Sequence, residues 1–392
     1  MEQKRRLIFI IDSPFTDKPG GRETWITNIA AHMRKHGYET YVICRDTKRT
    51  QRYNASGELK LVRIKTLQSV IPNFLLWTKM SLGLLLVFDM VTFVIQSYRT
   101  AKRLLAEKGN QITYFVAMNT VTEGIVAACI KRRLKYPKVV VSVRGKAPLE
   151  ISQTLPYLKP FAYFAERRVL HTIENIWANG YDTAEYLKKL GGRPTVIPNG
   201  VDYRTFSELR QQSTPYRVLT VMNIATLRPI KGIPQLTRAI PKIAQLTKRA
   251  FKVVLVGAGD PTIYQEYLKR KNCERFVYFP GAVPAIEAIR DADIVTCLSG
   301  GGGMSMSALE AMAAGKAIVA WDSPVYRQLI KNGESALLVP EGDTDALAKA
   351  VVDLMKSQKL RKHLGENARK AAKKYDWERV CEKMDAALRS IE

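Results

Sequence analysis

The 392-residue sequence has only five cysteines, and no two of them form a C-x-x-C pair. Most lie in apolar runs, which favours buried thiols over disulfides or a metal site. Because free thiols persist in reducing compartments, this pattern predicts a cytoplasmic chain. The start, MEQKRRLIFIIDSP, is basic and then apolar, but Asp12 and Pro14 end the apolar part too early for a signal peptide. We interpret it as the first buried strand.

Long apolar runs are also missing: no stretch reaches the roughly 20 apolar residues that a membrane-spanning helix needs. Residues 67–100 come nearest, but Lys79 and Asp89 interrupt them and Pro72 lies near their start. A spanning helix is the least favoured interpretation. A helix in the domain core and a helix or hairpin on a membrane surface both stay open. The second is supported by flanking basic residues and by aromatic residues of the type found at membrane interfaces, namely Phe74, Trp77, Phe88, Phe93 and Tyr98.

Acidic residues are scarce: 36 Asp and Glu stand against 62 Lys and Arg, giving a formal net charge of +26. Most of the excess falls in residues 1–200. A basic balance points to an anionic partner, which could be nucleic acid, a membrane surface or a substrate. Nucleic acid is the weakest choice, because the basic residues are dispersed and no recognition motif occurs. The basic run KRRLKYPK (131–138) is either a solvated helix end or a contact for lipid or another polyanion.

Short apolar runs alternate with amphipathic segments along the chain, a pattern typical of α/β domains with parallel sheets. The alternation begins at residue 7, breaks over the polar residues 203–216 and then starts again. A chain of 392 residues is also longer than one core usually covers. We therefore predict two consecutive βαβ domains, residues 1–205 and 206–374.

One stretch of the second domain predicts a ligand site. A short apolar strand (294–298) runs into four glycines (300–303), and the helical pattern that follows carries Glu310. In an open α/β sheet, ligands bind beyond the carboxyl ends of the strands. Glycines let backbone N–H groups approach an anion, and a helix N-terminus adds partial positive charge. We predict a phosphate held by residues 302–305, with Glu310 beyond it.

Four segments, in their order and spacing, resemble the retaining glycosyltransferases of family 4, which have the GT-B fold. They are PTVIPNGVD (194–202), NIATLRPIKG (223–232), VVLVGAGD (253–260) and SALEAMAAGKAIVA (307–320). GGRETW (20–25) and YDWERV (375–380) fit as well, so the resemblance covers nearly the whole chain. It implies two Rossmann-like α/β domains facing across a cleft, with the final helix (375–392) crossing back to the N-terminal domain. A nucleotide-sugar donor would bind the C-terminal domain and the acceptor the N-terminal one.

The resemblance also assigns donor-binding side chains. Lys231 matches the family lysine that meets the donor diphosphate. The arginine that accompanies it usually lies where this chain has Thr226, so Arg228 is the nearest candidate. Glu310 matches the glutamate that accepts hydrogen bonds from the ribose hydroxyls. Without the resemblance, these three would be read as exposed loop cations and a surface carboxylate.

Backbone groups carry the rest of the implied donor site. The matching segment that meets phosphate and sugar contains Gly302, Gly303, Met304 and Ser305. Gly20 and Gly21 match the N-domain loop that approaches the diphosphate, although a tight turn would explain them too. Pro280 and Gly281 fall where the nucleotide base lies in the family, held by backbone groups, so the base is not readable.

This chain departs from the family pattern at two places. The first of two family glutamates falls on Gly302, and residues 294–309 contain no acidic residue, which leaves the sugar undefined. The histidine that many members carry after the strand 139–143 is also missing, since the loop reads VRGKAP. Arg144 is the candidate there for binding acceptor or sugar oxygens, or else a structural arginine paired with a carboxylate. Lys146 is a weaker candidate.

The implied activity is retaining transfer of a hexose-type sugar from a nucleotide sugar to a hydroxyl acceptor. Cell-envelope, lipid-linked or exopolysaccharide glycans are the expected setting, with the enzyme in the cytoplasm or peripheral on the inner face of the membrane. We expect no cofactor and no metal: Asp291-Ala292-Asp293 resembles a metal-binding D-x-D motif, but it lies at a helix end where Asp293 would cap the turn. The alternatives are a non-catalytic nucleotide-sugar or glycan binding module, and an epimerase or phosphorylase of the same fold.

Overall fold

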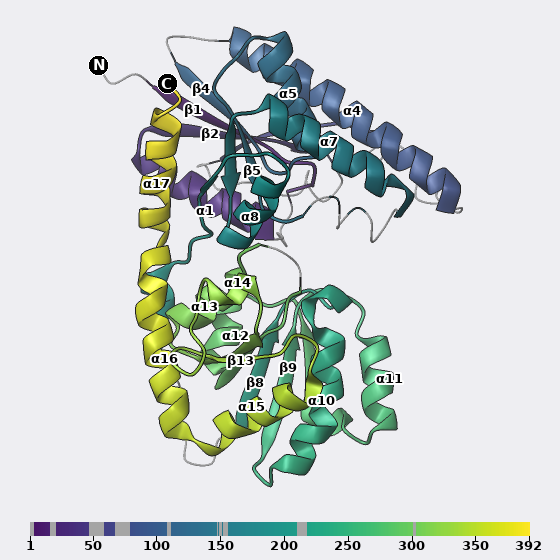
Figure 1. Cartoon of the computed structure of the whole chain (residues 1–392), viewed down its shortest axis with the longest axis vertical. Coiled ribbons are helices and arrows are strands. Elements are labelled where there is room, and N and C mark those ends of the chain that lie inside the picture. Colours follow the sequence, from purple (N-terminus) through teal and green to yellow (C-terminus); the bar gives the residue numbers. More distant parts are fainter. Residues whose placement is uncertain are drawn as a thin grey trace. The chain divides into compact units, whose positions relative to one another are not determined.

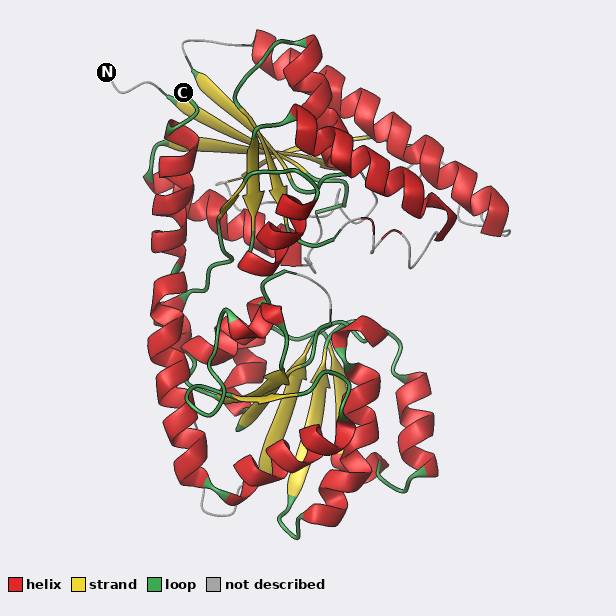
Figure 2. Ribbon diagram, viewed as in Figure 1, coloured by secondary structure: helices red, strands yellow, loops and turns green. Residues whose placement is uncertain are grey.

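A computed structural model of the chain divides into two compact units (Figure 1). The first unit comprises Met1–Pro198 with Val380–Glu392, and the second comprises Asn199–Arg379. The structure describes residues 4–15, 21–46, 59–66, 79–107, 111–146, 148, 151, 156–209, 218–300 and 303–392, without the side chains of 79–85. Figure 2 shows that each unit contains a sheet flanked by helices.

The first unit is built on a seven-stranded sheet in the order β3-β2-β1-β4-β5-β6-β7, with all neighbours parallel. Its strands are β1 (Arg5–Ile10), β2 (Tyr38–Arg45), β3 (Leu59–Ile64), β4 (Ile112–Ala117), β5 (Val139–Val143), β6 (Asn175–Ala178) and β7 (Pro194–Val196). The central strands are buried along nearly their whole length, because helices cover both faces of a parallel sheet. The strand order reverses between β1 and β4.

Helices cover both faces of this sheet. They are α1 (Gly21–Lys35), α4 (Lys79–Ala106), α5 (Thr122–Arg133), η2 (Pro156–Leu158), α7 (Lys159–Thr172) and α8 (Tyr181–Lys189). Residues of α4, α5, α7 and α8 share one apolar cluster with Ile8 and Ile10 of β1. Phe9, which points to the opposite face, meets Trp25 of α1 edge-on, with the ring centroids 5.8 Å apart.

The last helix, α17 (Trp377–Arg389), returns the chain to the first unit, as the family resemblance implies. Tyr38 Oη donates a hydrogen bond of 2.7 Å to Asp385 of this helix. Arg5 Nε donates one of 3.0 Å to Glu392 beyond it. These contacts attach the helix to the start of β2 and of β1.

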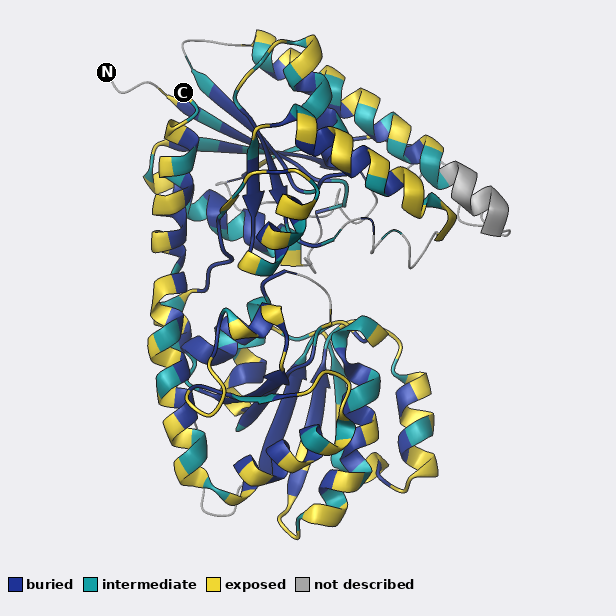
Figure 3. Ribbon diagram, viewed as in Figure 1, coloured by how far each residue is buried: buried dark blue, intermediate teal, exposed yellow. Residues whose placement is uncertain are grey.

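Helix α4 contains the described part of residues 67–100, of which 67–78 lie outside the described residues. Within the part of the chain that the structure describes, no helix has the length and apolarity that crossing a membrane requires. One face of α4 lies in the core: Phe93 and Ser97 are fully buried and Asp89 is 1% exposed. The opposite face exposes Phe88 and Ile95. Figure 3 shows buried and exposed segments alternating along the helices of this unit. The helix therefore belongs to the domain core along one side, with an apolar outer side.

The second unit has a six-stranded parallel sheet in the order β10-β9-β8-β11-β12-β13. Its strands are β8 (Leu219–Ile224), β9 (Phe251–Val256), β10 (Val277–Gly281), β11 (Ile294–Cys297), β12 (Ala317–Trp321) and β13 (Leu337–Val339). Its helices are α9 (Tyr203–Ser207), η3 (Pro229–Lys231), α10 (Ile233–Leu246), α11 (Thr262–Arg270), η4 (Glu274–Phe276), α12 (Ala285–Asp291), α13 (Met306–Ala313), α14 (Pro324–Arg327), α15 (Thr344–Lys356), α16 (Gln358–Ala372) and η5 (Lys373–Tyr375). Here the strand order reverses between β8 and β11.

The polar interval between the predicted domains contains a helix that its sequence did not reveal. Helix α9 begins after Asp202, whose carboxylate accepts a hydrogen bond of 3.0 Å from the Thr205 N–H. The unit boundary lies earlier, between Pro198 and Asn199. The five cysteines are all free thiols, as predicted, and four of them are buried.

Candidate functional site

Two loops of the second unit meet where its strand order reverses. The loop after β8 contains Lys231, and the loop after β11 contains Ser299, whose hydroxyl lies 3.3 Å from Lys231 Nζ. The Gly300 N–H donates a hydrogen bond of 3.0 Å to the Ile230 carbonyl, which joins the two loops through their backbones. In open parallel sheets, this reversal point at the carboxyl ends of the strands is where ligands bind.

Gly232 allows this close approach. Its φ is +74°, in the left-handed region that favours glycine. A Cβ atom at this position would lie 2.4 Å from both the Cβ and the carbonyl oxygen of Leu298. No larger residue fits, so glycine holds the end of η3, and with it Lys231, against the loop that follows β11.

The two cations predicted to meet a diphosphate lie on one turn. The Lys231 N–H donates a hydrogen bond of 2.9 Å to the Arg228 carbonyl, which brings both residues into the same turn of chain. The Arg228 side chain is exposed and makes no hydrogen bond or ion pair with the residues that the structure describes, whereas Lys231 is half-buried. Thr226, at the usual family position of the arginine, is exposed on the same loop.

The predicted phosphate-binding backbone leads into helix α13. Gly303 has φ +94°, which again favours glycine, and Met304 is buried. Ser305 caps the helix by accepting a hydrogen bond of 3.3 Å from the Ala308 N–H. The positive end of the helix dipole therefore lies at this loop. Gly302 lies outside the described residues.

Glu310 is the half-buried acid of this region. Burial raises the pKa of its carboxyl to about 7. No hydrogen bond or ion pair reaches the carboxylate from the described part of the chain. Cys297, at the end of β11, is close enough for Glu310 to add to the burial that raises the pKa of its thiol to about 12. A carboxylate in this state is suited to accept hydrogen bonds from a polar ligand.

Three further residues shape these loops and were missed by the sequence analysis. Asn199 Nδ2 donates a hydrogen bond of 2.7 Å to the Met304 carbonyl and so fixes that turn. Tyr326 Oη accepts one of 3.0 Å from the Ser299 N–H. A Cβ at Gly300 would lie 2.7 Å from Glu341 Oε1, so this carboxylate closely approaches the glycine run. Tyr326 follows β12 and Glu341 follows β13. Polar residues just after the end of a predicted strand are the sequence pattern from which they could have been predicted.

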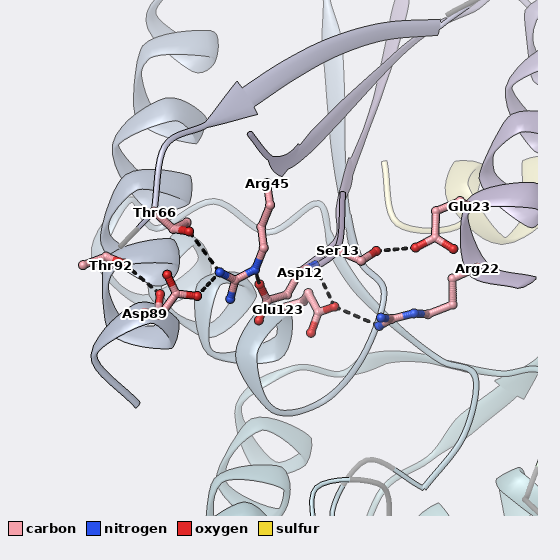
Figure 4. A network of polar contacts seen from close by, with 9 residues as sticks. All are labelled: Asp12, Ser13, Arg22, Glu23, Arg45, Thr66, Asp89, Thr92 and Glu123. Carbon is pink, nitrogen blue, oxygen red and sulfur yellow. Dashed lines mark hydrogen bonds and ion pairs between the residues drawn. The ribbon is translucent and has the colours of Figure 1, made fainter. Parts of the chain in front are cut away.

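The first unit has its own polar network where its strand order reverses, between β1 and β4 (Figure 4). Glu123, in the first turn of α5, accepts hydrogen bonds of 3.0 Å from the Asp12 N–H and 3.1 Å from Arg22 Nη1. Burial raises the pKa of the Glu123 carboxyl, and Arg22 opposes that effect. Ser13, beside Asp12, donates a hydrogen bond to Glu23 of α1. The sequence alone predicts no role for these residues.

Arg45, the last residue of β2, extends this network to helix α4. Its guanidinium pairs with Asp12 and with the buried Asp89 of α4. It also donates a hydrogen bond of 3.0 Å to Thr66 Oγ1 and lies over the Phe93 ring, 5.5 Å from its centroid. The network thereby joins the carboxyl end of β2 to the inner face of α4.

The predicted N-domain residues lie elsewhere in the first unit. Arg144 follows β5, and its Cζ lies 3.5 Å from the centroid of a Trp25 ring, so the guanidinium stacks on α1. Burial lowers the pKa of Arg144 well below its usual value. Lys146 lies over the ring of Tyr186, 5.4 Å from its centroid. Gly21 begins α1, where an added Cβ would meet no atom within 4 Å, and Gly20 lies outside the described residues.

The D-x-D sequence has structural contacts. Asp293 Oδ2 accepts a hydrogen bond of 2.8 Å from the Thr220 N–H at the start of β8, and Asp291 pairs with Arg290 at 3.5 Å. Across the described residues, no group of three or more His, Cys, Asp or Glu side chains is placed to hold a metal ion.

Comparison with known families accounts for both units. The profile of Glycosyltransferase Family 4 matches residues 19–204, and that of Glycosyl transferases group 1 matches residues 206–371. The chain belongs to glycosyltransferase family 4. Its two α/β units with parallel sheets are those of the GT-B fold, as the sequence predicted.

Individual relatives are more distant. The chain is 31% identical over 199 residues to phosphatidyl-myo-inositol mannosyltransferase of Mycobacterium leprae, a match over 49% of this chain and 52% of that protein. It thus spans about half the length of such curated relatives. Among solved structures, sucrose-phosphate synthase from Thermosynechococcus elongatus superposes with a TM-score of 0.81 over 99% of both chains at 18% identity. Anabaena HepE in complex with UDP-glucose gives 0.76 over 98% of this chain and 99% of that one, at 20% identity. These structures share the fold.

Proposed function

We propose that this family 4 member transfers a hexose-type sugar from a nucleotide-sugar donor to a hydroxyl acceptor with retention of anomeric configuration. The observation that carries the proposal is the junction of the β8 and β11 loops, where Lys231, Arg228 and the start of α13 gather. A diphosphate needs cations and N–H donors at such a place, and it needs them more as the glycosidic bond breaks. The UDP-glucose complex of the similarly folded HepE supports a nucleotide-sugar donor.

In the proposed reaction, the bond from the anomeric carbon to the diphosphate oxygen breaks and a bond to the acceptor oxygen forms on the same face. The proton of the acceptor hydroxyl passes to the departing phosphate oxygen. Lys231 and Arg228 stabilise the charge that develops on this oxygen, together with backbone N–H groups of residues 303–305. In this front-face course the acceptor attacks the anomeric carbon directly, and no side chain of the enzyme forms a covalent intermediate.

Glu310 holds the donor by its ribose. Its carboxylate has no hydrogen-bond or ion-pair partner among the described residues and lies four residues inside the helix that Ser305 caps. Two ribose hydroxyls can donate hydrogen bonds to one carboxylate, and these bonds offset the unfavourable free energy of burying it. We place the nucleotide base near Pro280 and Gly281, at the carboxyl end of β10.

We place the acceptor on the first unit, near the polar network of Asp12 and Glu123. Carboxylates and guanidinium groups at the reversal point of a parallel sheet are suited to bind a hydroxylated ligand. Arg144, at the carboxyl end of β5, is a further candidate for acceptor or sugar oxygens. The lipid headgroup in the name of the mycobacterial mannosyltransferase, together with the basic first half of this chain, supports a lipid-linked acceptor of envelope or exopolysaccharide synthesis.

We further propose that the enzyme works without a metal or cofactor, as a cytoplasmic protein in peripheral contact with the inner membrane face. The two cations and the α13 dipole supply positive charge for the diphosphate. Five free thiols suit a reducing compartment. An unchanged transfer rate after treatment with a chelator supports metal independence, and a loss that added Mg²⁺ restores contradicts it.

The decisive experiment pairs a panel of UDP-, GDP- and ADP-sugars with the purified chain and measures released nucleotide and the shift in melting temperature. We expect one donor to bind and to be turned over in the presence of a hydroxyl acceptor. Lys231→Ala should lower the transfer rate by about 10²-fold, because one electrostatic contact to the leaving group is lost. Lys362→Ala, at an exposed site on α16, is the matched control and should leave the rate unchanged.

Two results would refute the proposal. A Lys231→Ala variant within a few-fold of the wild-type rate would remove the role given to this lysine. A donor that raises the melting temperature but is never turned over with any acceptor would favour a binding module without catalysis.

A further inference from the structure

Helix α7 exposes a stripe of aromatic side chains in the first unit. Tyr157, in the 3-10 turn before it, is 59% exposed, and Phe161 and Phe164 are 53% and 65% exposed. Residues separated by four and then three positions lie on one side of a helix. The other side faces the protein, where Ala162 and Ala165 are buried. Several large apolar side chains exposed in one row are typical of an interaction surface.

Helix α4 exposes a second apolar stripe of the same kind. Phe88, Val91 and Ile95 are 61%, 47% and 44% exposed, at spacings of three and four residues. Asp89 and Phe93, on the inner side, are buried. Each helix thus presents a row of large apolar side chains to the outside of the same unit.

The two stripes lie on helices that both pack against α5. Met90 of α4 packs against a small apolar cluster that includes Val121 beside α5 and Ala162 and Ala165 of α7. Side chains of the two helices thus meet beneath their exposed stripes, and Figure 1 shows α4 and α7 beside α5. We call the exposed face of α4 and α7 the two-helix surface.

Basic residues continue both stripes toward the C-terminal ends of the helices. On α4 the outward positions after Ile95 are Arg99 and Lys102, and on α7 the position after Phe164 is Arg168; all three are exposed. Aromatic and aliphatic side chains followed by Arg and Lys match a bilayer interface that carries anionic lipid. The rings enter the acyl boundary, and the cations stay with the headgroups.

We propose that the two-helix surface docks this protein on an anionic membrane, with Phe88, Phe161 and Phe164 inserted at the interface. The proposal deepens the proposed function and rests on it for the lipid-linked acceptor, but the docking itself requires no catalysis. A second copy of the chain is a poorer occupant, because it would add the same positive charges to the interface and supply no anionic group to neutralise Arg99, Lys102 and Arg168. A membrane with anionic lipid neutralises them instead.

Vesicle flotation at physiological salt tests the docking with the full chain. The wild type should float with phosphatidylcholine–phosphatidylglycerol vesicles and should remain unbound with phosphatidylcholine alone. Phe161→Ser with Phe164→Ser should weaken binding by about tenfold or more per ring. Arg99→Gln, Lys102→Gln and Arg168→Gln together should weaken it by about fivefold per charge. Ile263→Ser and Tyr278→Ser, at positions 68% and 62% exposed in the second unit, are matched controls and should float like the wild type.

Wild-type protein that stays unbound with anionic vesicles overturns the proposal, and so does binding that the Phe pair leaves unchanged. A soluble dimer that the Phe pair converts to monomer assigns the surface to a second copy instead. Transfer to a short-chain, water-soluble acceptor separates this proposal from the proposed function. The Phe pair should leave that rate unchanged, while a wild type that floats but transfers to no acceptor refutes the function and leaves the docking in place.

Discussion

A half-buried carboxyl such as that of Glu310 is unfavourable for a protein without ligand. Burial raises its pKa from the ordinary value of 4.5 to about 7, so the folded chain binds a proton that the unfolded chain has already released. Its contribution to the free energy of unfolding is fully present below the unfolded pKa. It is lost as the pH rises through the folded pKa of about 7. A residue kept at such a cost commonly serves a ligand.

Glu310→Gln should therefore stabilise the ligand-free protein at alkaline pH and have little effect in acid. The amide cannot ionise, so the variant escapes the loss that the wild type suffers between pH 4.5 and about 7. We expect a gain on the order of 1 to 3 kcal/mol in the free energy of unfolding at pH 8. Urea unfolding at pH 8 and pH 4.5 measures it, and an equal difference at both pH values would contradict the assignment.

Donor binding should release a proton near neutral pH. Ribose hydroxyls donate to the ionised carboxylate, so binding favours the charged form of Glu310 and affinity falls by up to about tenfold per unit as the pH drops below its pKa of about 7. Titration calorimetry in two buffers of different ionisation enthalpy measures the release. The same binding heat in both buffers would show that Glu310 does not change its protonation. Glu310→Gln is the matched variant and should bind the donor weakly without releasing a proton.

At the scale of elements, both sheets use their reversal points in the same way. In the second unit the loops after β8 and β11 meet through Lys231 and Ser299, and in the first unit the segments after β1 and β4 meet through Asp12 and Glu123. In the second unit, Gly232 precedes the helix that follows β8 and Ser305 caps the helix that follows β11. The order of strands thus brings together residues that are far apart in the sequence.

Gly232→Ala should disturb this junction more than the strain of its backbone explains. The added Cβ would lie 2.4 Å from two atoms of Leu298, so the β8 and β11 loops must separate and Lys231 must move. Gly333→Ala is the control, since its φ of +72° is similar, no atom lies within 4 Å of an added Cβ, and it has no role in the proposed donor site. The control should lose about 1 kcal/mol of stability, and Gly232→Ala more than that, together with donor affinity. If both variants lose the same melting temperature and the same donor affinity, the β8 and β11 loops are not in close contact at Gly232.

The sequence predicts elements well where apolar runs alternate with helical periods, as along β8 to β12, because burial on both faces of a parallel sheet leaves that pattern. A strand end followed by glycines is a local signal for the phosphate loop with Glu310 beyond it, whereas Lys231 is assigned through the family resemblance. Contacts such as that of Asn199 with the Met304 carbonyl cannot be predicted from the sequence pattern, because they join residues 105 positions apart. The outer face of α7 escapes for a similar reason: the period marks a helix, but only packing against α5 decides which side remains exposed.

At the scale of the whole molecule, two separate cores stabilise the chain. Buried residues of the second unit form one large apolar cluster around its own sheet, and those around β1, β4 and β5 form another in the first unit. Separate cores unfold as separate cooperative units when few contacts join them. A ligand that binds one unit stabilises that unit by mass action.

Calorimetry should therefore resolve two unfolding transitions, of which the nucleotide sugar shifts one. At a donor concentration about 100 times its dissociation constant the stabilisation is about 2.7 kcal/mol, or roughly 5 to 10 °C for a unit of this size. Lys231→Ala should reduce this shift and leave the other transition in place. A single transition that moves as a whole with donor would show that the two cores unfold together.

The ion pair between Arg45 and Asp89 determines which apolar side chains this protein shows to its surroundings. Helix α4 is apolar on nearly every side around Asp89, so hydrophobic contact alone would hold it against the sheet in several rotations about its own axis. The carboxylate meets Arg45 in only one of them, and any other rotation leaves a buried charge without its ion. This ion pair therefore fixes the rotation of α4 about its axis, and that rotation leaves Phe88 and Ile95 exposed.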